Sequence, residues 1–375
     1  MFPPGVGGSE MYAYELANAL GDAGHEVDVY TQSVTKEDRP VSLSPRVSVE
    51  RICHARNYLV TFETLYYSLK TRLEIDLQKY DVIHGTLMPA STIALSLRLG
   101  NETPIVVTSH GTSIGETCSH TPEIPTDYLL RYFFHPMNVV LDSIAGRTAD
   151  HIIAISKNTK KQLDETYRFD SNKLSLIPHG VDTDRFYPRK ESHEAVSPNK
   201  TSFLFVGRLA SRKGVSRVIK ALTMFRGEKV ELLVAGSGRH KERLKRLAGI
   251  QGVSNRVRFL GYVPDDELPQ LYSSADVFVF PSRYEGFGLV FLEAMACGTP
   301  VIGTPVGGVP DVIENGETGF VIDEEINSLS ERLRYCHENP KRVQEMSNSA
   351  RQKAKNMDWS RVAAKVETVY EQVSE

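Results

Sequence analysis

Cysteine, tryptophan and long apolar runs are the features of which this chain has least. Its 375 residues include four cysteines and one tryptophan. The cysteines are widely separated and form no C-x-x-C pair, so neither a zinc site nor a disulfide framework is predicted. No apolar run approaches the roughly 20 residues that cross a bilayer. These features favour a protein of the reducing cytoplasm.

An excess of charge of one sign is also absent. The chain has 44 basic and 47 acidic residues, a net charge of −3, which argues against a dedicated nucleic-acid binder. The hydrophobic share of 41% and the charged share of 24% are ordinary for globular proteins. At about 150 residues per domain, the length predicts two domains. Residues 205–258 are strongly basic, with 14 Lys and Arg against three acids. We interpret Arg239, Lys241, Arg243, Lys245 and Arg246 among them as a solvated helix face.

Repeated strand-then-helix units predict an α/β fold with parallel sheets. In the N-terminal half, a helix is expected at residues 9–23 and strands at 26–30, 47–52, 82–83, 105–108, 151–155 and 174–177. Residues 184–200 lose this periodicity and gain Pro, Ser and charge, which predicts a linker. Beyond it, strands are expected at 201–206, 230–235, 257–259, 277–280 and 301–302, and helices at 214–224, 239–248, 268–274, 288–296 and 359–373.

Two doubly wound, Rossmann-like domains follow from this pattern. We expect an N-terminal domain at residues 1–187, with the helix at 359–375 packing back on it, and a C-terminal domain at 188–358. Such sheets bind ligands beyond the carboxyl ends of their strands, so two facing sheets would form a cleft between the domains.

The segment at residues 281–300 carries the strongest chemical pattern. A buried strand ends at Phe280, a turn with two glycines follows, and a helix opens near Gly288. Glycines allow close approach of a ligand, and the unpaired amides of a first helical turn attract anions, so a phosphate is the expected guest. Glu285 and Glu293 flank this helix start, and their carboxylates can accept hydrogen bonds from sugar hydroxyls. Capping and surface roles are the alternative for these two glutamates.

These motifs resemble glycosyltransferase family 4, retaining enzymes with the GT-B fold. Residues 285–293 match the family's E-x7-E pattern, accompanied by a G-F-G-L turn and an A-C-G-T-P-V run. Further matches are P-G-V-G-G-S-E at 4–10, H-G-T at 110–112, I-P-H-G-V-D at 177–182, V-G-R-L at 206–209, K-G at 213–214, G-S-G at 236–238 and T-P-V-G-G-V-P at 304–310. The resemblance therefore covers most of the chain.

The resemblance implies roles for individual residues in binding a nucleotide-diphosphate sugar. Glu293 is similar to the glutamate that holds the ribose, and Glu285 to the one that contacts the donor sugar. Arg208 and Lys213 match the basic pair that neutralises the diphosphate, and their places after a strand and before a helix suit fixed cations in a cleft. Solvated surface charges are the alternative for this pair. The turn also contributes Gly286, Phe287, Gly288 and Leu289 to the expected donor site.

Two further elements of the expected site lie in the N-terminal half. Gly7 and Gly8 resemble the family's glycine loop, which packs against the diphosphate and the acceptor. His110 resembles the histidine at the acceptor side of the donor sugar, and with Glu285, Arg208 and Lys213 it completes the expected catalytic set. A histidine that satisfies a hydrogen bond in the core is the alternative for His110.

No cofactor and no catalytic metal are expected. Asp182 and Asp184 form a D-x-D, but the resemblance places a structural G-V-D turn there, and Arg208, Lys213 and helix-end amides supply the positive charge instead. The implied reaction is departure of a nucleoside diphosphate with retention at the anomeric carbon. No nucleophile like that of a retaining glycosidase can be identified, so Glu285 is expected to bind rather than to form a covalent intermediate.

The sequence also bears on functions other than that of a glycosyltransferase. A GT-B epimerase would lack the E-x7-E turn, and a phosphorylase needs a pyridoxal lysine that cannot be located. A non-catalytic nucleotide or nucleic-acid binding module, built on residues 205–258, remains the alternative from another class.

The acceptor is a glycan, a lipid or a small molecule, and the sequence does not distinguish among them. Residues 57–77 and 128–140 are rich in aromatic and apolar side chains. Core-facing helices are the favoured interpretation, and peripheral contact with the inner face of a membrane is the alternative.

The resemblance also implies that the first strand of the N-terminal sheet is missing. The chain begins inside the loop that normally follows that strand, so we expect either that the native protein starts upstream of Met1 or that this domain is weakened as it stands.

Overall fold

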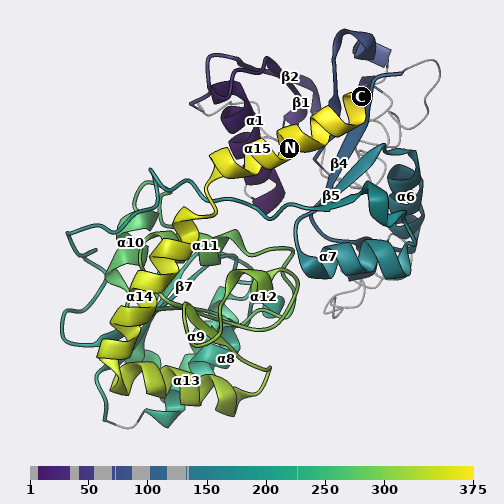
Figure 1. Cartoon of the computed structure of the whole chain (residues 1–375). Coiled ribbons are helices and arrows are strands. Elements are labelled where there is room, and N and C mark those ends of the chain that lie inside the picture. Colours follow the sequence, from purple (N-terminus) through teal and green to yellow (C-terminus); the bar gives the residue numbers. More distant parts are fainter. Residues whose placement is uncertain are drawn as a thin grey trace. The chain divides into compact units, whose positions relative to one another are not determined.

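The chain forms two compact units. The computed structural model describes residues 7–33, 42–54, 70–71, 73–86, 102–115, 132, 135–225 and 227–375. One unit comprises Met1–His179 with Trp359–Glu375, and the other comprises Gly180–Asp358 (Figure 1).

A six-stranded parallel sheet forms the centre of the Gly180–Asp358 unit. Its strand order is β12-β11-β10-β7-β8-β9. The strands are β7 (Thr201–Val206), β8 (Val230–Ala235), β9 (Val257–Gly261), β10 (Val277–Phe280), β11 (Val301–Gly303) and β12 (Gly319–Val321). From β7 the chain proceeds outward to β8 and β9, and then returns to β10 on the other side of β7. This reversal places a crevice at the carboxyl ends of β7 and β10, where such sheets bind ligands.

Helices cover both faces of this sheet, which explains why its strands are almost continuously apolar. Every residue of β8 and β10 is buried. Phe205 of β7 stacks on Phe280 of β10, with ring centroids 4.9 Å apart. The helices are α8 (Val215–Ala221), α9 (Lys241–Ile250), α10 (Leu268–Ser274), α11 (Leu289–Ala296), α12 (Val309–Val312), α13 (Ile326–Glu338) and α14 (Pro340–Lys355), with short 3-10 turns at Ser211–Lys213, Leu222–Met224 and Ser254–Arg256.

The segment at residues 184–200 differs from the predicted linker, because it packs within the Gly180–Asp358 unit. The backbone amide of Arg189 donates to the Ser273 hydroxyl at 3.0 Å, and that of His193 donates to the Ser274 hydroxyl at 2.7 Å. Ser197 bonds the buried Glu231 carboxylate through both its amide and its hydroxyl. The polar composition therefore serves hydrogen bonds to α10 and β8 rather than solvation of a free connection.

Two parallel sheets lie in the other unit. Strand β1 (Val27–Ser33) pairs with β2 (Val47–His54), and a four-stranded sheet has the order β3-β4-β5-β6. Its strands are β3 (Ile83–Gly85), β4 (Ile105–Ser109), β5 (His151–Ala154) and β6 (Leu174–Leu176). The helices are α1 (Gly8–Asp22), α6 (His135–Thr148), α7 (Lys157–Lys161) and α15 (Trp359–Ser374), with a π-helical turn at Gln162–Thr166 and 3-10 turns at Leu77–Lys79 and Ser171–Lys173.

The C-terminal helix α15 joins this unit although almost 180 residues separate it from the preceding segment. It packs against α1, as the yellow and purple helices of Figure 1 show. Trp359 meets the buried Tyr12 of α1 edge to face, with ring centroids 5.7 Å apart. The hydroxyl of Tyr370 lies 2.6 Å from Nδ1 of His84, on β3. The helix therefore completes the core beside β3.

The two segments considered for membrane contact lie largely outside the described residues. Of these segments, residues 70–71, 73–77, 132 and 135–140 are described. Ile75 and Leu77 are buried in the core, whereas Leu73, Tyr132 and Val140 are exposed. Within the described ranges, no helix is long and apolar enough to cross a bilayer.

Candidate active site

Lys213 and Glu285 meet at the carboxyl ends of β7 and β10. Lys213 ends the 3-10 turn after β7, and Glu285 lies in the turn after β10. The two turns are tied by backbone contacts: the Arg283 amide donates to the Arg212 carbonyl at 2.7 Å. Gly214 has φ +81°, and a Cβ there would overlap the Pro281 carbonyl, so a side chain at this position would force the turns apart.

The pair is a nearly buried ion pair. Nζ of Lys213 donates to Oε1 of Glu285, and the two side chains are 13% and 12% exposed. Burial lowers the pKa of Lys213, and the Glu285 carboxylate opposes this shift. Nζ of Lys213 also lies 5.1 Å from the centroid of the Phe280 ring. The strand end thus holds one cation and one carboxylate in fixed positions.

Arg208 lies on the same turn as Lys213 and is exposed. Its charge helps to lower the pKa of Lys213. The Leu209 amide donates to the Ser237 carbonyl at 2.8 Å, which ties this turn to the glycine turn after β8. The predicted basic pair therefore lies on one turn, with one member solvated and the other paired.

The glycine turn before α11 is supported from behind by a second glycine turn. Gly288 is the N-cap of α11, and Phe287 before it is buried. The Gly308 amide donates to the Gly286 carbonyl at 3.0 Å. A Cβ at Gly307, whose φ is +54°, would overlap the Glu285 carbonyl. Residues 304–308 thus fix the backbone that presents Glu285, and Leu289 begins the helix.

Glu293 lies on α11 and has a partner of its own. The hydroxyl of Tyr272, on α10, donates to Oε2 of Glu293 at 2.9 Å. Burial raises the pKa of Glu293, and this hydrogen bond opposes the shift. The two glutamates of the E-x7-E pattern therefore engage different elements, Glu285 the turn after β7 and Glu293 helix α10.

His110 belongs to the other unit, where it follows β4. Its Nδ1 lies 3.1 Å from Nε2 of His179, and its ring meets Tyr12 edge to face at 4.7 Å between centroids. Nε2 of His110 is buried and has no hydrogen-bond partner among the described residues. Burial, aided by the nearby His84, lowers the pKa of His110 to about 3, so the imidazole is neutral at physiological pH.

Gly7 and Gly8 stand at the start of α1. Gly7 is the N-cap and is extended, with φ −161° and ψ 161°, and its carbonyl accepts from the Met11 amide at 3.1 Å. Tyr12, one turn further along, carries the ring that touches His110. The predicted glycine loop and the predicted histidine are therefore connected through α1.

The D-x-D sequence at Asp182 and Asp184 forms a turn. Oδ1 of Asp182 accepts from the amides of Asp184 and Arg185 at 3.0 and 2.9 Å. The Thr183 hydroxyl donates to Asp358 at 3.0 Å. Among the described residues, no group of three or more His, Cys, Asp or Glu side chains is placed to hold a metal ion.

Two partners of the predicted site residues could not be anticipated from the sequence. Tyr272 lies on a short helix whose pattern indicated only burial. His179 belongs to the I-P-H-G-V-D run, but nothing in that run indicated contact with a histidine 69 residues earlier.

Comparison with known proteins identifies the family. Residues 188–353 match the model described as Glycosyl transferases group 1, and residues 6–185 match Glycosyltransferase Family 4. The chain is 30% identical over 331 residues to a glycosyltransferase of Methanocaldococcus jannaschii, covering 85% of this chain and 82% of the relative. It is 30% identical over 382 residues to a D-inositol 3-phosphate glycosyltransferase of Arthrobacter sp., covering 96% and 88%.

A solved structure shares the architecture. Sucrose-phosphate synthase from Thermosynechococcus elongatus superposes with a TM-score of 0.84 and 25% identity, over 98% of this chain and 94% of that one. The α/β fold with parallel sheets is thus the GT-B fold. The chain belongs to glycosyltransferase family 4, which confirms the resemblance seen in the sequence, and the predicted enzyme class, a glycosyltransferase acting on nucleotide sugars, is confirmed with it.

Proposed function

We propose that this glycosyltransferase moves a sugar from a nucleoside diphosphate to its acceptor with retention of the anomeric configuration, and that the turns after β7 and β10 bind the donor. The observation that carries the proposal is the ion pair of Lys213 and Glu285 beside the start of α11. It holds a diphosphate-binding cation and a hydroxyl-binding carboxylate where a nucleotide sugar needs both.

The leaving diphosphate is the group that requires stabilisation. Negative charge grows on it as the glycosidic bond breaks, and fixed cations lower the energy of that state. Lys213 and Arg208 supply this charge, and the start of α11 adds partial positive charge. When the donor binds, the Lys213 ammonium turns from Glu285 toward phosphate, which frees the carboxylate for the sugar hydroxyls.

Glu293 and His110 act at the two ends of the donor. Glu293, oriented by Tyr272, accepts hydrogen bonds from the ribose hydroxyls. For His110, which belongs to the other unit, we propose a role at the acceptor side of the donor sugar. Because the attacking hydroxyl approaches the face that the diphosphate leaves, no covalent sugar intermediate is required.

For the acceptor, we propose a small phosphorylated polyol or sugar. The Arthrobacter relative is named for D-inositol 3-phosphate, and the sucrose-phosphate synthase for a phosphorylated disaccharide. Both therefore handle a small phosphorylated compound. A lipid acceptor remains the second candidate.

Thermal unfolding with UDP, GDP and ADP tests the donor site. One of these at 100 times its dissociation constant should stabilise the chain by about 2.7 kcal/mol. Lys213→Gln and Arg208→Gln should each lose most of this stabilisation, whereas Lys245→Gln, an exposed charge on α9, should keep it. Stabilisation that survives in both Lys213→Gln and Arg208→Gln would overturn the assignment.

Transfer assays test the acceptor class. With the donor chosen by the unfolding screen, the initial rate with D-inositol 3-phosphate is compared with that for unphosphorylated inositol. We expect product from the phosphate ester alone. Equal rates for the two acceptors, or transfer only to lipid extracts, would contradict the phosphorylated-acceptor proposal while leaving the donor site untouched.

A further inference from the structure

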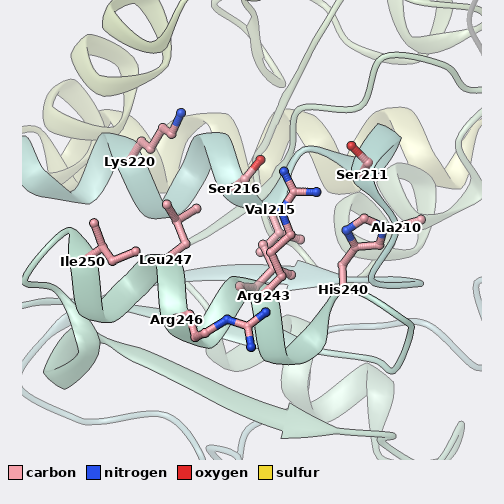
Figure 2. Close-up of a pocket in the computed structure, with 11 residues that line it drawn as sticks. Ala210, Ser211, Val215, Ser216, Lys220, His240, Arg243, Arg246, Leu247 and Ile250 are labelled. Atoms are coloured by element: carbon pink, nitrogen blue, oxygen red, sulfur yellow. The ribbon is translucent and has the colours of Figure 1, made fainter. Parts of the chain in front are cut away.

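A groove with unneutralised positive charge lies between α8 and α9, apart from the residues of the candidate active site. Its volume is about 330 Å³, within the range of pockets that hold small molecules. It is lined by side chains of both helices and of the turns that precede them (Figure 2). Neither Arg208, Lys213, Glu285 nor Glu293 lines it, although Ser211, which does, shares a 3-10 turn with Lys213.

Three cations border the groove without a counter-ion. Lys220 comes from α8, and Arg243 and Arg246 come from α9. In the described part of the chain, no ion pair or side-chain hydrogen bond engages any of the three. The sequence of α8 contains no acid, and Glu242, the acid of α9, pairs with Lys245 at 3.0 Å. The groove therefore attracts anions, and a charged ligand would not have to displace a protein carboxylate.

Donor groups gather at one end of the groove. Figure 2 shows the Arg243 guanidinium near the hydroxyls of Ser216 and Ser211 and near the His240 ring. A guanidinium presents a planar fork of N–H donors that matches phosphate oxygens, and each hydroxyl adds a further donor. Carboxylates are absent from the residues that line this end. Several donors in this arrangement fit a phosphate group, which has several acceptor oxygens, better than an anion with a single acceptor atom.

The other end of the groove is apolar. Leu247 and Ile250 of α9 line it, and Ile250 is 80% exposed. A ligand that covers such an exposed aliphatic side chain would stabilise the complex by about 25 cal/mol for each Å² removed from water. Lys220 lies on the α8 side at this end of the groove in Figure 2. The ligand therefore combines an anionic head with an apolar or sugar-like body.

We propose that this groove is a binding site for a small organic phosphate, with the phosphate at Arg243, Ser216 and Ser211 and the organic part on Leu247 and Ile250. The volume suits a free metabolite. The proposal rests on residues other than Arg208, Lys213, Glu285 and Glu293, and the Lys213→Gln variant below distinguishes the two sites because Ser211 shares a turn with Lys213.

Calorimetric titration of the whole chain with phenyl phosphate tests the proposal, since this probe joins a phosphate to an apolar ring. We expect saturable binding of one molecule per chain, and phenol, which lacks the phosphate, should not bind. Arg243→Glu should weaken binding at least tenfold. The matched control Lys245→Glu reverses an exposed charge on the same helix outside the groove, and it should change binding less than twofold.

Four results would overturn the site. The first is the absence of saturable phenyl phosphate binding, and the second is equal binding of phenol. The third is an equal loss of affinity for phenyl phosphate in Arg243→Glu and Lys245→Glu. The fourth is a loss of that affinity in Lys213→Gln, which would place the probe in the donor site. Circular dichroism of each variant verifies folding, which we expect to persist because Arg243 and Lys245 are exposed. Arg243-dependent sedimentation with phosphatidylglycerol vesicles would assign the phosphate to a lipid headgroup and would overturn the assignment to a free metabolite.

Discussion

Lys213 donates a charged hydrogen bond to Glu285 across 72 residues of sequence, and the two side chains are nearly buried together. Removing one member of such a pair leaves a charge that neither water nor protein fully compensates. Substituting either of these proposed donor-binding residues should therefore also lower the stability of the ligand-free protein.

Glu285→Gln is expected to lose transfer while retaining the nucleotide. The amide keeps the size of the side chain but no longer balances Lys213, so the ligand-free variant should be less stable, by less than the roughly 3–5 kcal/mol of a fully buried pair. The rate of transfer should fall by about 100-fold or more, since one electrostatic contact to the reacting sugar is lost. Initial rates and calorimetric affinity for the nucleoside diphosphate measure both effects.

The control for this variant is Glu324→Gln. Glu324 also pairs with basic side chains, at 3.3 Å from Arg283, but its side chain is 54% exposed. Glu324→Gln should therefore leave the rate of transfer and the stability of the chain nearly unchanged. A transfer rate in Glu285→Gln equal to that of Glu324→Gln would remove Glu285 from the site.

Tyr272→Phe is expected to weaken nucleotide binding through Glu293. The substitution deletes the hydroxyl 2.9 Å from the Glu293 carboxylate and leaves that partly buried group short of a donor. Stability should fall by about 1–3 kcal/mol, and the affinity for the nucleoside diphosphate should fall several-fold because the carboxylate is no longer oriented. Urea unfolding and calorimetry give the two values.

Tyr262→Phe is the matched control, since Tyr262 is 64% exposed. If Tyr272→Phe binds nucleotide as tightly as Tyr262→Phe does, the Tyr272 hydroxyl has no part in positioning Glu293.

Acid should destabilise the chain through three buried histidines. Burial lowers the pKa of His84 to about 4 and of His110 to about 3, and it lowers the pKa of His179 well below its usual value. The unfolded chain takes up protons near pH 6.5, while the folded chain keeps these rings neutral. Stability is therefore fully present above about pH 6.5 and is lost as the pH falls toward 4, by about 1.4 kcal/mol per pH unit for each ring.

Urea unfolding between pH 7 and pH 4 measures this dependence. His179→Asn removes one of the three rings, so its stability should decline less steeply over the same range. If the free energy of unfolding declined with pH equally in the wild type and His179→Asn, the pKa of His179 would be the same in the folded and unfolded chain, which contradicts this prediction.

Five of the six strands of the sheet in the Gly180–Asp358 unit could be predicted closely from the sequence, whereas β12 was not predicted. Thr201–Val206, Val230–Ala235 and Val277–Phe280 agree residue for residue with expectation, because strands covered on both faces are short apolar runs bounded by polar or glycine residues. Helices α13 and α14 were not predicted. Both helices are predominantly polar, and each buries only a narrow stripe of residues, such as Leu333 on α13 and Met346 on α14. Which residues form that stripe depends on the packing of these helices in the folded unit, so the sequence alone does not show it.

In the candidate site, too, the sequence predicts the local features but not the contacts between distant segments. Glycine turns and a glutamate spacing are local, so Glu285 and the start of α11 could be located from the sequence. The contact of Tyr272 with Glu293, and that of His179 with His110, join distant segments. Such contacts depend on how helices pack, which the local spacing of residues does not specify.

Gly307→Ala should damage both stability and activity, since the position combines backbone strain with a close contact. Its φ of +54° is unfavourable for alanine, and the new Cβ would overlap the Glu285 carbonyl. Gly316→Ala separates the two effects, because Gly316 has φ +84° but no atom within 4 Å of the added Cβ. That control should lose about 1–2 kcal/mol from strain alone and should transfer sugar normally. Gly307→Ala should lose more stability and also most of its transfer rate, because the turn that carries Glu285 must move. Equal stabilities and equal rates for the two variants, measured by urea unfolding and initial-rate assays, would show that residues 304–308 do not hold Glu285 in place.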